Sequence, residues 1–223
     1  MKRATKKKLA FLGGFAAYFG ALWLLWGTPV VYPLKIFVVL LHETSHALAL
    51  WATGGTVERI TLNAAQGGAT YGYGGSAFIT LSAGYLGSLL WGVVLALSAN
   101  TRRVRANLVV GLLGGLVAGL TLLYVRSVFG VGFGVLFAVA LVGVAARLPL
   151  VWNRGVLTVL GMTSCLYAIL DIKSDVLDRP ELRSDAAMLA ELTGVPTLAW
   201  GTLWIAVALV VCFFLARALW KKA

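Results

Sequence analysis

Long runs of apolar residues, separated by short polar stretches, repeat along most of the chain. Each run is close to the length that a helix needs to cross the hydrocarbon layer of a bilayer, roughly 20 residues. The sixth run contains Arg154 near its start, and an arginine near a helix end can extend its charged group to the membrane surface. The pattern therefore predicts an all-α polytopic membrane protein with six or seven spans, at residues 9–27, 35–53, 77–98, 107–125, 128–146, 150–172 and 195–216.

The polar segment 54–76 interrupts this pattern directly after the second run. It is rich in Gly, Thr and Tyr and too polar to cross a bilayer, and its composition fits two short strands at 56–62 and 69–74 with a turn near Gln66. This β-hairpin is either an ordinary surface loop or a re-entrant sheet edge to which another strand could add. Composition alone favours the surface loop.

A second polar segment, 173–194, follows the core helices 77–172. Together with Asp171 it holds six of the eight acidic residues of the chain. We expect a short surface helix inside this acidic loop, with Ser184 as its N-cap and Gly194 as its C-terminal stop, before the last helix at 195–216. The whole of 1–223 is then one membrane-embedded domain.

Composition supports the membrane assignment and argues against other classes. The chain is 60% hydrophobic and 12% charged, far from the average of soluble domains. Its net charge of +11 comes from Lys and Arg clustered at the ends of apolar runs, which is typical of anchoring at a lipid bilayer, and we expect no nucleic-acid partner. Cys165 and Cys212 lie inside apolar runs, so neither a disulfide framework nor a cysteine metal site is expected.

The second apolar run contains three ionisable side chains, His42, Glu43 and His46. Charged groups are costly inside a membrane helix and indicate function there. The two histidines lie one helical turn apart, the right spacing for binding one metal ion, and Glu43 beside them can accept a proton from metal-bound water. The alternative is that this His-Glu-x-x-His spacing arose by chance. Chance is a poor explanation, because the chain has only two His and four Glu to place in it.

A catalytic zinc site needs one more protein ligand, which must come from elsewhere because no third His exists. Cysteine is one alternative, but a carboxylate near the end of an apolar helix is a better candidate. Asp171 and Asp175 share one helical face, and Asp171 is the more deeply placed. The second and sixth spans run in the same direction if three helices lie between them, so we select Asp171 as third ligand. The alternative for Asp171 is an ordinary interfacial acid.

Several of these segments together resemble a known family. HETSHALAL on a membrane helix, the Gly-rich hairpin, SAGYLGS at the start of the next helix, and LYAILDIKSDV followed by SDAAMLAELTG look like the site-2 protease family of intramembrane zinc metallopeptidases, in particular short bacterial-type members without a PDZ domain. The similarity extends from about residue 35 to 204, and the histidine motif is its most specific part.

The resemblance implies a zinc ion held by His42, His46 and a distant Asp, with Glu43 as general base. It also implies cleavage of transmembrane protein substrates within the bilayer of a bacterial plasma membrane, and a hairpin that receives the unwound substrate as an added strand. The chain departs from better-known members, which carry a Gly-Pro and an Asn where it has Ala83–Ser88, and a Gly after the Asp where it has Ile172. These departures leave the third ligand open between Asp171 and Asp175.

The resulting functional hypothesis is zinc-dependent endopeptidase activity on transmembrane proteins. An inactive metal-binding scaffold is the second interpretation, although a structural zinc site needs no general base and usually has four protein ligands. A transporter that handles protons or metal ions is the third, and we find no internal repeat of the kind that many transporters show. Substrate identity, orientation and oligomeric state are not determined by the sequence.

Overall fold

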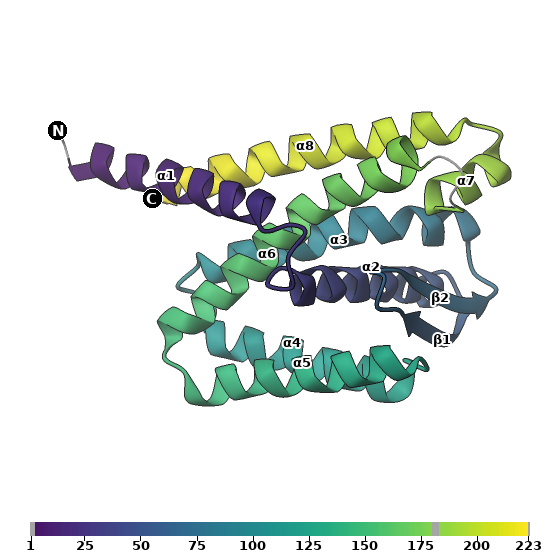
Figure 1. The fold of residues 1–223 in the computed structure, drawn as a ribbon, viewed down its shortest axis with the longest axis horizontal. Helices are drawn as coiled ribbons and strands as arrows, with labels where there is room; N and C mark the ends of the chain where they lie inside the picture. The colour runs from purple at the N-terminus through teal and green to yellow at the C-terminus, as the bar shows by residue number, and fades with distance from the viewer. Residues whose placement is uncertain (1–2, 180–182, 223) are drawn as a thin grey trace.

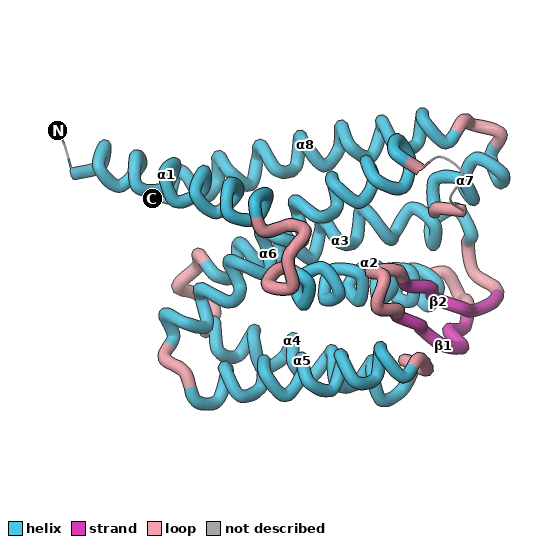
Figure 2. The backbone as a smooth tube through the Cα atoms, viewed as in Figure 1, coloured by secondary structure: helices cyan, strands magenta, loops and turns pink. Residues whose placement is uncertain are grey.

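The computed structural model describes residues 3–179 and 183–222, with the side chains of 3–8, 10–12 and 222 excepted. The chain folds into a helical bundle with one small sheet, as expected (Figures 1 and 2). The elements are α1 (Arg3–Leu24), α2 (Tyr32–Ala52), β1 (Thr56–Leu62), β2 (Gly68–Tyr73), α3 (Ala77–Ala99), α4 (Ala106–Leu123), α5 (Val128–Arg147), α6 (Leu150–Ile172), a π-helix (Lys173–Asp178), α7 (Asp185–Thr193) and α8 (Thr197–Lys222).

Among the described residues, six helices are long and apolar enough to cross a membrane: α2, α3, α4, α5, α8 and a continuous span from Leu150 to Asp178. The apolar stretch described in α1, Gly13–Leu24, is shorter than a span, so a seventh crossing stays a prediction. Arg154 does not interrupt the sixth helix, because its guanidinium donates to the backbone oxygen of Ala99 at the end of α3. The charge thus stabilises a helix end.

Helix α2 lies at the centre of the bundle. Its residues Ile36–Leu41 are almost fully buried, and Phe37 stacks on Phe137 of α5 with ring centroids 4.8 Å apart. Helices α2 and α6 run in the same direction, and their C-terminal ends lie on the side of the molecule that carries the sheet and α7 (Figure 1). The expectation about helix direction is therefore confirmed.

Helices α3 and α6 pack closely enough to bring backbone against backbone. A Cβ on Gly161 would lie 2.6 Å from the backbone nitrogen of Ala96, so only glycine fits there. The Ser164 hydroxyl also donates to the backbone oxygen of Ser88 across this contact, at 2.7 Å. These contacts, at the end and in the middle of α3, fix the position of α6 along that helix. Both helices border the site described below.

The polar segment 54–76 forms the expected antiparallel hairpin, with strands close to the predicted bounds. Beyond the hairpin, Ile60 of β1 donates its N–H to the backbone oxygen of Tyr124 and accepts from the N–H of Arg126. The outer edge of β1 is therefore covered by the connection between α4 and α5. Strand β2 pairs with β1 alone among the described residues.

The acidic segment is more helical than expected. Lys173–Asp178 continues α6 as a π-helix instead of beginning a loop, because Val176 is buried in an apolar cluster with Tyr85, Leu189 and Trp204. The predicted short helix is confirmed as α7: the Ser184 side chain accepts from the N–H of Ala187, and Gly194 has a positive φ of 74° at the C-terminal end. Residues 180–182 of this segment, including Glu181, lie outside the described residues.

Candidate metal and catalytic site

His42 and His46 lie on the face of α2 that is turned toward α3 and α7. Their ring centroids are 4.7 Å apart, as expected for side chains separated by one helical turn. The Nδ1 atom of His46 lies 2.7 Å from the backbone oxygen of Thr80 on α3. Because a carbonyl oxygen can only accept, Nδ1 carries a proton whether the ring is neutral or charged. Nε2, which faces Asp185, offers its lone pair to a metal ion when the ring is neutral and donates to Asp185 when the ring is protonated.

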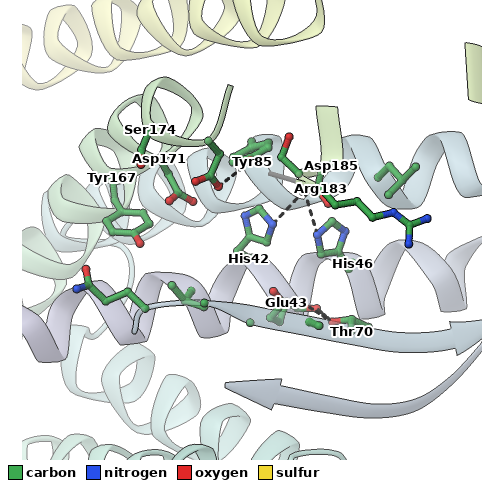
Figure 3. Close-up of a pocket in the computed structure, with 18 of the residues that line it drawn as sticks. His42, Glu43, His46, Thr70, Tyr85, Tyr167, Asp171, Ser174, Arg183 and Asp185 are labelled. Atoms are coloured by element: carbon green, nitrogen blue, oxygen red, sulfur yellow. Dashed lines mark hydrogen bonds and ion pairs between the residues drawn. The ribbon is translucent and has the colours of Figure 1, made fainter. Parts of the chain in front are cut away.

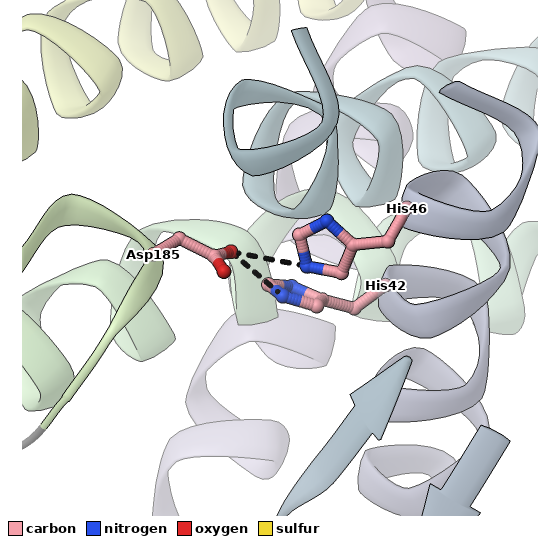
Figure 4. A group of neighbouring side chains, drawn as sticks. All are labelled: His42, His46 and Asp185. Carbon is pink, nitrogen blue, oxygen red and sulfur yellow. Dashed lines mark ion pairs between the residues drawn. The ribbon is translucent and has the colours of Figure 1, made fainter. Parts of the chain in front are cut away.

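Asp185, the first residue of α7, lies directly opposite the two rings (Figure 4). Its Oδ2 atom is 3.1 Å from Nε2 of His42 and 3.2 Å from Nε2 of His46. The ligand atoms of these three residues all lie within 4.8 Å of one another, a spacing that could hold one metal ion. Among the described residues, no hydrogen-bond donor other than the two rings approaches this buried Oδ2.

Burial alone raises the pKa of the Asp185 carboxyl, because it disfavours the charged form. The positive charge of His46 and the hydrogen bonds from both rings outweigh this effect. The pKa of Asp185 therefore lies below its usual range, and the carboxylate is ionised at neutral pH, the form in which it can bind a cation.

Glu43 lies beside the histidines and is held by the hairpin. The Thr70 hydroxyl of β2 lies 2.8 Å from Oε2 and 2.9 Å from the backbone oxygen of Glu43. On the other side of this carboxylate, Gly68 approaches so closely that a Cβ there would lie 2.6 Å from Oε1. Glu43 is 4% exposed, so its position is determined by contacts with β2.

These residues line a cavity of about 630 Å³ that is bordered by α2, α3, α6, the hairpin turn and the start of α7 (Figure 3). One wall consists of residues 65–70, which are mostly small. The opposite wall is one face of α6 with its π-helical extension, bearing Tyr167, Asp171, Ser174 and Asp175. The cavity has the volume of several amino-acid residues, and Glu43 belongs to its lining.

Residues 15–215, nearly the whole chain, match the family model described as Peptidase M50B-like. The chain belongs to this family. The resemblance to site-2 proteases is thereby confirmed, and with its apolar helices this M50B-like chain is a multi-pass membrane protein of a peptidase kind. Among curated proteins and among solved structures, none matches the chain.

The structure of this M50B-like chain brings Asp185, and not Asp171, to the two histidines. Asp171 lines the same cavity from α6, together with Asp175, but neither belongs to the three-residue group among the described residues. Depth along a membrane helix favoured Asp171 in the sequence. Asp185 was missed because it lies in the polar segment, and its proximity to the histidines depends on α7 folding back over the end of the bundle.

A local signal for Asp185 did exist. It directly follows the predicted N-cap Ser184, and the apolar residues Ala186 and Leu189 of the same helix are fully buried. A surface helix with a buried face must dock on another element, and an acidic residue in its first turn is then drawn into the contact. The sequence alone does not indicate where it docks.

Proposed function

We propose that this chain is an intramembrane zinc-dependent endopeptidase that hydrolyses peptide bonds within transmembrane segments of other proteins. The observation that carries the proposal is the convergence of His42, His46 and Asp185 on one point, directly beside a buried glutamate. Two histidines and one carboxylate make up a common ligand set of catalytic zinc and leave a fourth position for water.

The residues present fit such an ion. Oδ2 of Asp185 is buried without a donor other than the rings, and a metal ion between the three groups would satisfy it. Gly84 of α3 keeps the space next to them open, since a Cβ there would lie 2.6 Å from both Oδ2 of Asp185 and Cε1 of His42. Zinc bound by these residues supplies a Lewis acid that lowers the pKa of water and polarises a carbonyl group.

Glu43 is the general base of the proposed reaction. Thr70 donates to Oε2 and so fixes the orientation of the carboxylate, which leaves Oε1 to accept the proton of the attacking water. Glu43 then passes this proton to the nitrogen of the leaving amine when the peptide bond breaks. No other carboxylate is held beside the histidines by a hydrogen bond from the hairpin among the described residues.

The substrate backbone binds along the free edge of β2. The backbone N–H and C=O of Ile60 are both hydrogen-bonded to the α4–α5 connection. Ile60 and its partner on β2, Thr70, are therefore a non-hydrogen-bonded pair of the antiparallel ladder. In such a pair the backbone N–H and C=O of Thr70 point away from β1. These groups lie beside Glu43 and are available to an added strand. A helical substrate segment must unwind first, because its backbone groups are otherwise engaged in its own helix.

The deciding experiment compares the purified full chain with the Glu43→Gln variant, both loaded with one equivalent of zinc in lipid nanodiscs. Single-span model proteins with a helix-weakening Gly-Pro pair at successive depths serve as substrates. We expect the parent chain to cleave at least one of them and Glu43→Gln to bind zinc equally well without cleaving. Equal cleavage by both would exclude the proposed mechanism, and zinc binding without cleavage by the parent would favour the inactive-scaffold interpretation.

A further inference from the structure

Asp171 is a carboxylate that the proposed reaction does not use. It lies on α6 inside the span Leu150–Asp178, seven residues before the end of that span, and its side chain borders the cavity (Figure 3). An ionised group at such a position is costly unless it is paired or functional. The question is therefore which cation balances it.

The neighbouring carboxylate, Asp175, is balanced by the chain itself. Its Oδ1 atom accepts from the guanidinium of Arg179 at 2.7 Å, and its Oδ2 atom accepts from the hydroxyl of Tyr85 at 3.0 Å. Asp175 therefore has both an opposite charge and a hydrogen bond. The Asp175 carboxylate on the cavity wall is therefore already neutralised by a residue of the chain.

Asp171 has no such partner. The Tyr167 hydroxyl is its hydrogen-bonding neighbour, but Asp171 forms no ion pair with any described residue. The two arginines at the cavity are engaged elsewhere, Arg179 with Asp175 and Arg183 with Glu191. The two charges of a zinc ion would be balanced by Asp185 and Glu43. Asp171 thus lines the cavity without a cation of the described chain bonded to it.

The position of Asp171 decides what can reach it. The cavity wall of residues 65–70 offers backbone for strand addition, and the α6 wall lies across from it (Figure 3). Side chains of an extended segment project to both sides of its backbone, so alternate side chains of a substrate on β2 point toward α6. The α6 wall bears two carboxylates and the hydroxyls of Tyr167 and Ser174. The guanidinium of Arg179 next to this wall is bonded to Asp175 and to the Ser174 hydroxyl, and it forms no ion pair with Asp171.

We infer that Asp171 is a specificity-determining residue that binds a Lys or Arg side chain of the substrate close to the scissile bond. The inference rests on the proposed function and adds the class of substrate: transmembrane segments with a basic residue near one end. Such residues are common at membrane surfaces, and their long side chains can extend several ångström along the segment. Asp171 lies roughly 10 Å from the end of its span, by the rise of 1.5 Å per helical residue. A basic residue within the last two turns of a substrate segment can therefore bring its charged group to Asp171.

The test measures binding without hydrolysis. The ligands are single-span peptides of leucine and alanine, each with one Lys, Gln or Glu at one position in its last three turns. The affinity of each peptide for the zinc-loaded Glu43→Gln full chain is measured in lipid nanodiscs. We expect a Lys peptide to bind about 30-fold more tightly than the Gln peptide of the same position, as for a charge pair shielded from water. Asp171→Asn in this background should remove the preference, and Asp171→Lys should transfer it to the Glu peptide.

Asp178→Asn is the matched control, because Asp178 is exposed and paired with Lys173 outside the cavity. It should keep the full preference for Lys. If Asp171→Asn does not fold, as judged by its thermal midpoint, Asp171→Ser gives the same comparison. No preference for Lys at any position, or a preference that survives both neutral variants, overturns the inference. So does an Asp171→Asn variant that loses zinc and weakens all peptides equally. Cleavage by the parent chain is measured separately, so failure of the proposed function is a distinct result.

Discussion

The hydroxyl of Thr70 on β2 donates to Glu43 on α2, lying 2.8 Å from its Oε2 and 2.9 Å from its backbone oxygen. This contact joins the strand proposed to receive the substrate to the residue proposed as general base. The orientation of the base is therefore coupled to the position of the hairpin, and several expected results follow from that coupling and from the geometry at Asp185.

Thr70→Val keeps the shape of the side chain and removes the hydroxyl. We expect kcat to fall about tenfold, because the Glu43 carboxylate loses the bond that orients it, while zinc content stays at one equivalent. Cleavage of a model substrate and metal analysis measure the two effects. Thr61→Val is the matched control on β1, where the hydroxyl donates to the backbone oxygen of Ala69 and to no catalytic or metal-binding residue among those described. Equal losses in both variants would indicate that the hydroxyls merely stabilise the hairpin.

Two glycine substitutions should separate catalysis from metal binding. A Cβ at Gly68 would lie 2.6 Å from Oε1 of Glu43, so Gly68→Ala displaces the base and lowers turnover with zinc still bound. A Cβ at Gly84 would lie 2.6 Å from Oδ2 of Asp185, so Gly84→Ala pushes apart the ligands and lowers zinc affinity. Zinc titration against a chromophoric chelator and turnover at saturating zinc distinguish them. A loss of zinc affinity in Gly68→Ala, with only turnover lowered in Gly84→Ala, would contradict both assignments.

Asp185→Asn and Asp171→Asn test the third ligand directly. We expect Asp185→Asn to weaken zinc binding by more than about 100-fold, because loss of a ligand exceeds the 10–100-fold effect typical of groups that only support ligands. Asp171→Asn should bind zinc like the parent chain. Equilibrium dialysis of both variants gives the answer, and zinc loss confined to Asp171→Asn would return the third ligand to the position selected from helix depth.

The N-cap of α7 should influence the metal site although it does not touch it. Ser184→Ala removes the acceptor for the N–H of Ala187 and destabilises the first turn of α7 by about 1 kcal/mol. Asp185 lies in that turn, so zinc affinity should fall several-fold. Ser184→Thr, which retains the cap, should restore it. An affinity unchanged in Ser184→Ala would show that Asp185 is positioned by the docking of α7 alone.

Strand addition at β2 predicts a periodic response in the substrate. In a peptide bound to one strand edge, every second N–H donates to that edge. N-methylation at successive positions should therefore weaken binding at alternate residues, by about tenfold at each sensitive position, and leave those between nearly unaffected. Binding to the Glu43→Gln variant measures this scan. A response that repeats every three to four residues would indicate that the substrate binds as a helix.

The hairpin shows how far local sequence reasoning extends. Its strands were predicted from Thr, Tyr and Gly content and lie within one residue of the observed bounds. That β1 is covered by Tyr124 and Arg126, and that β2 has the free edge, could not be predicted. These contacts join segments more than 60 residues apart, and composition carries no information on which edge is covered.

The sequence by itself determined the membrane helices, the position of His42, Glu43 and His46 on one of them, and the caps of α7. Each of these depends on hydrophobicity or on spacing within one turn, which the neighbouring residues settle. Only the tertiary structure decided that Asp185 lies against the two histidines and that Asp171 lines the cavity from α6. Both are carboxylates near the same end of the bundle, and the choice between them depends on how α7 docks against α3 and α8, which is set by the packing of the whole fold.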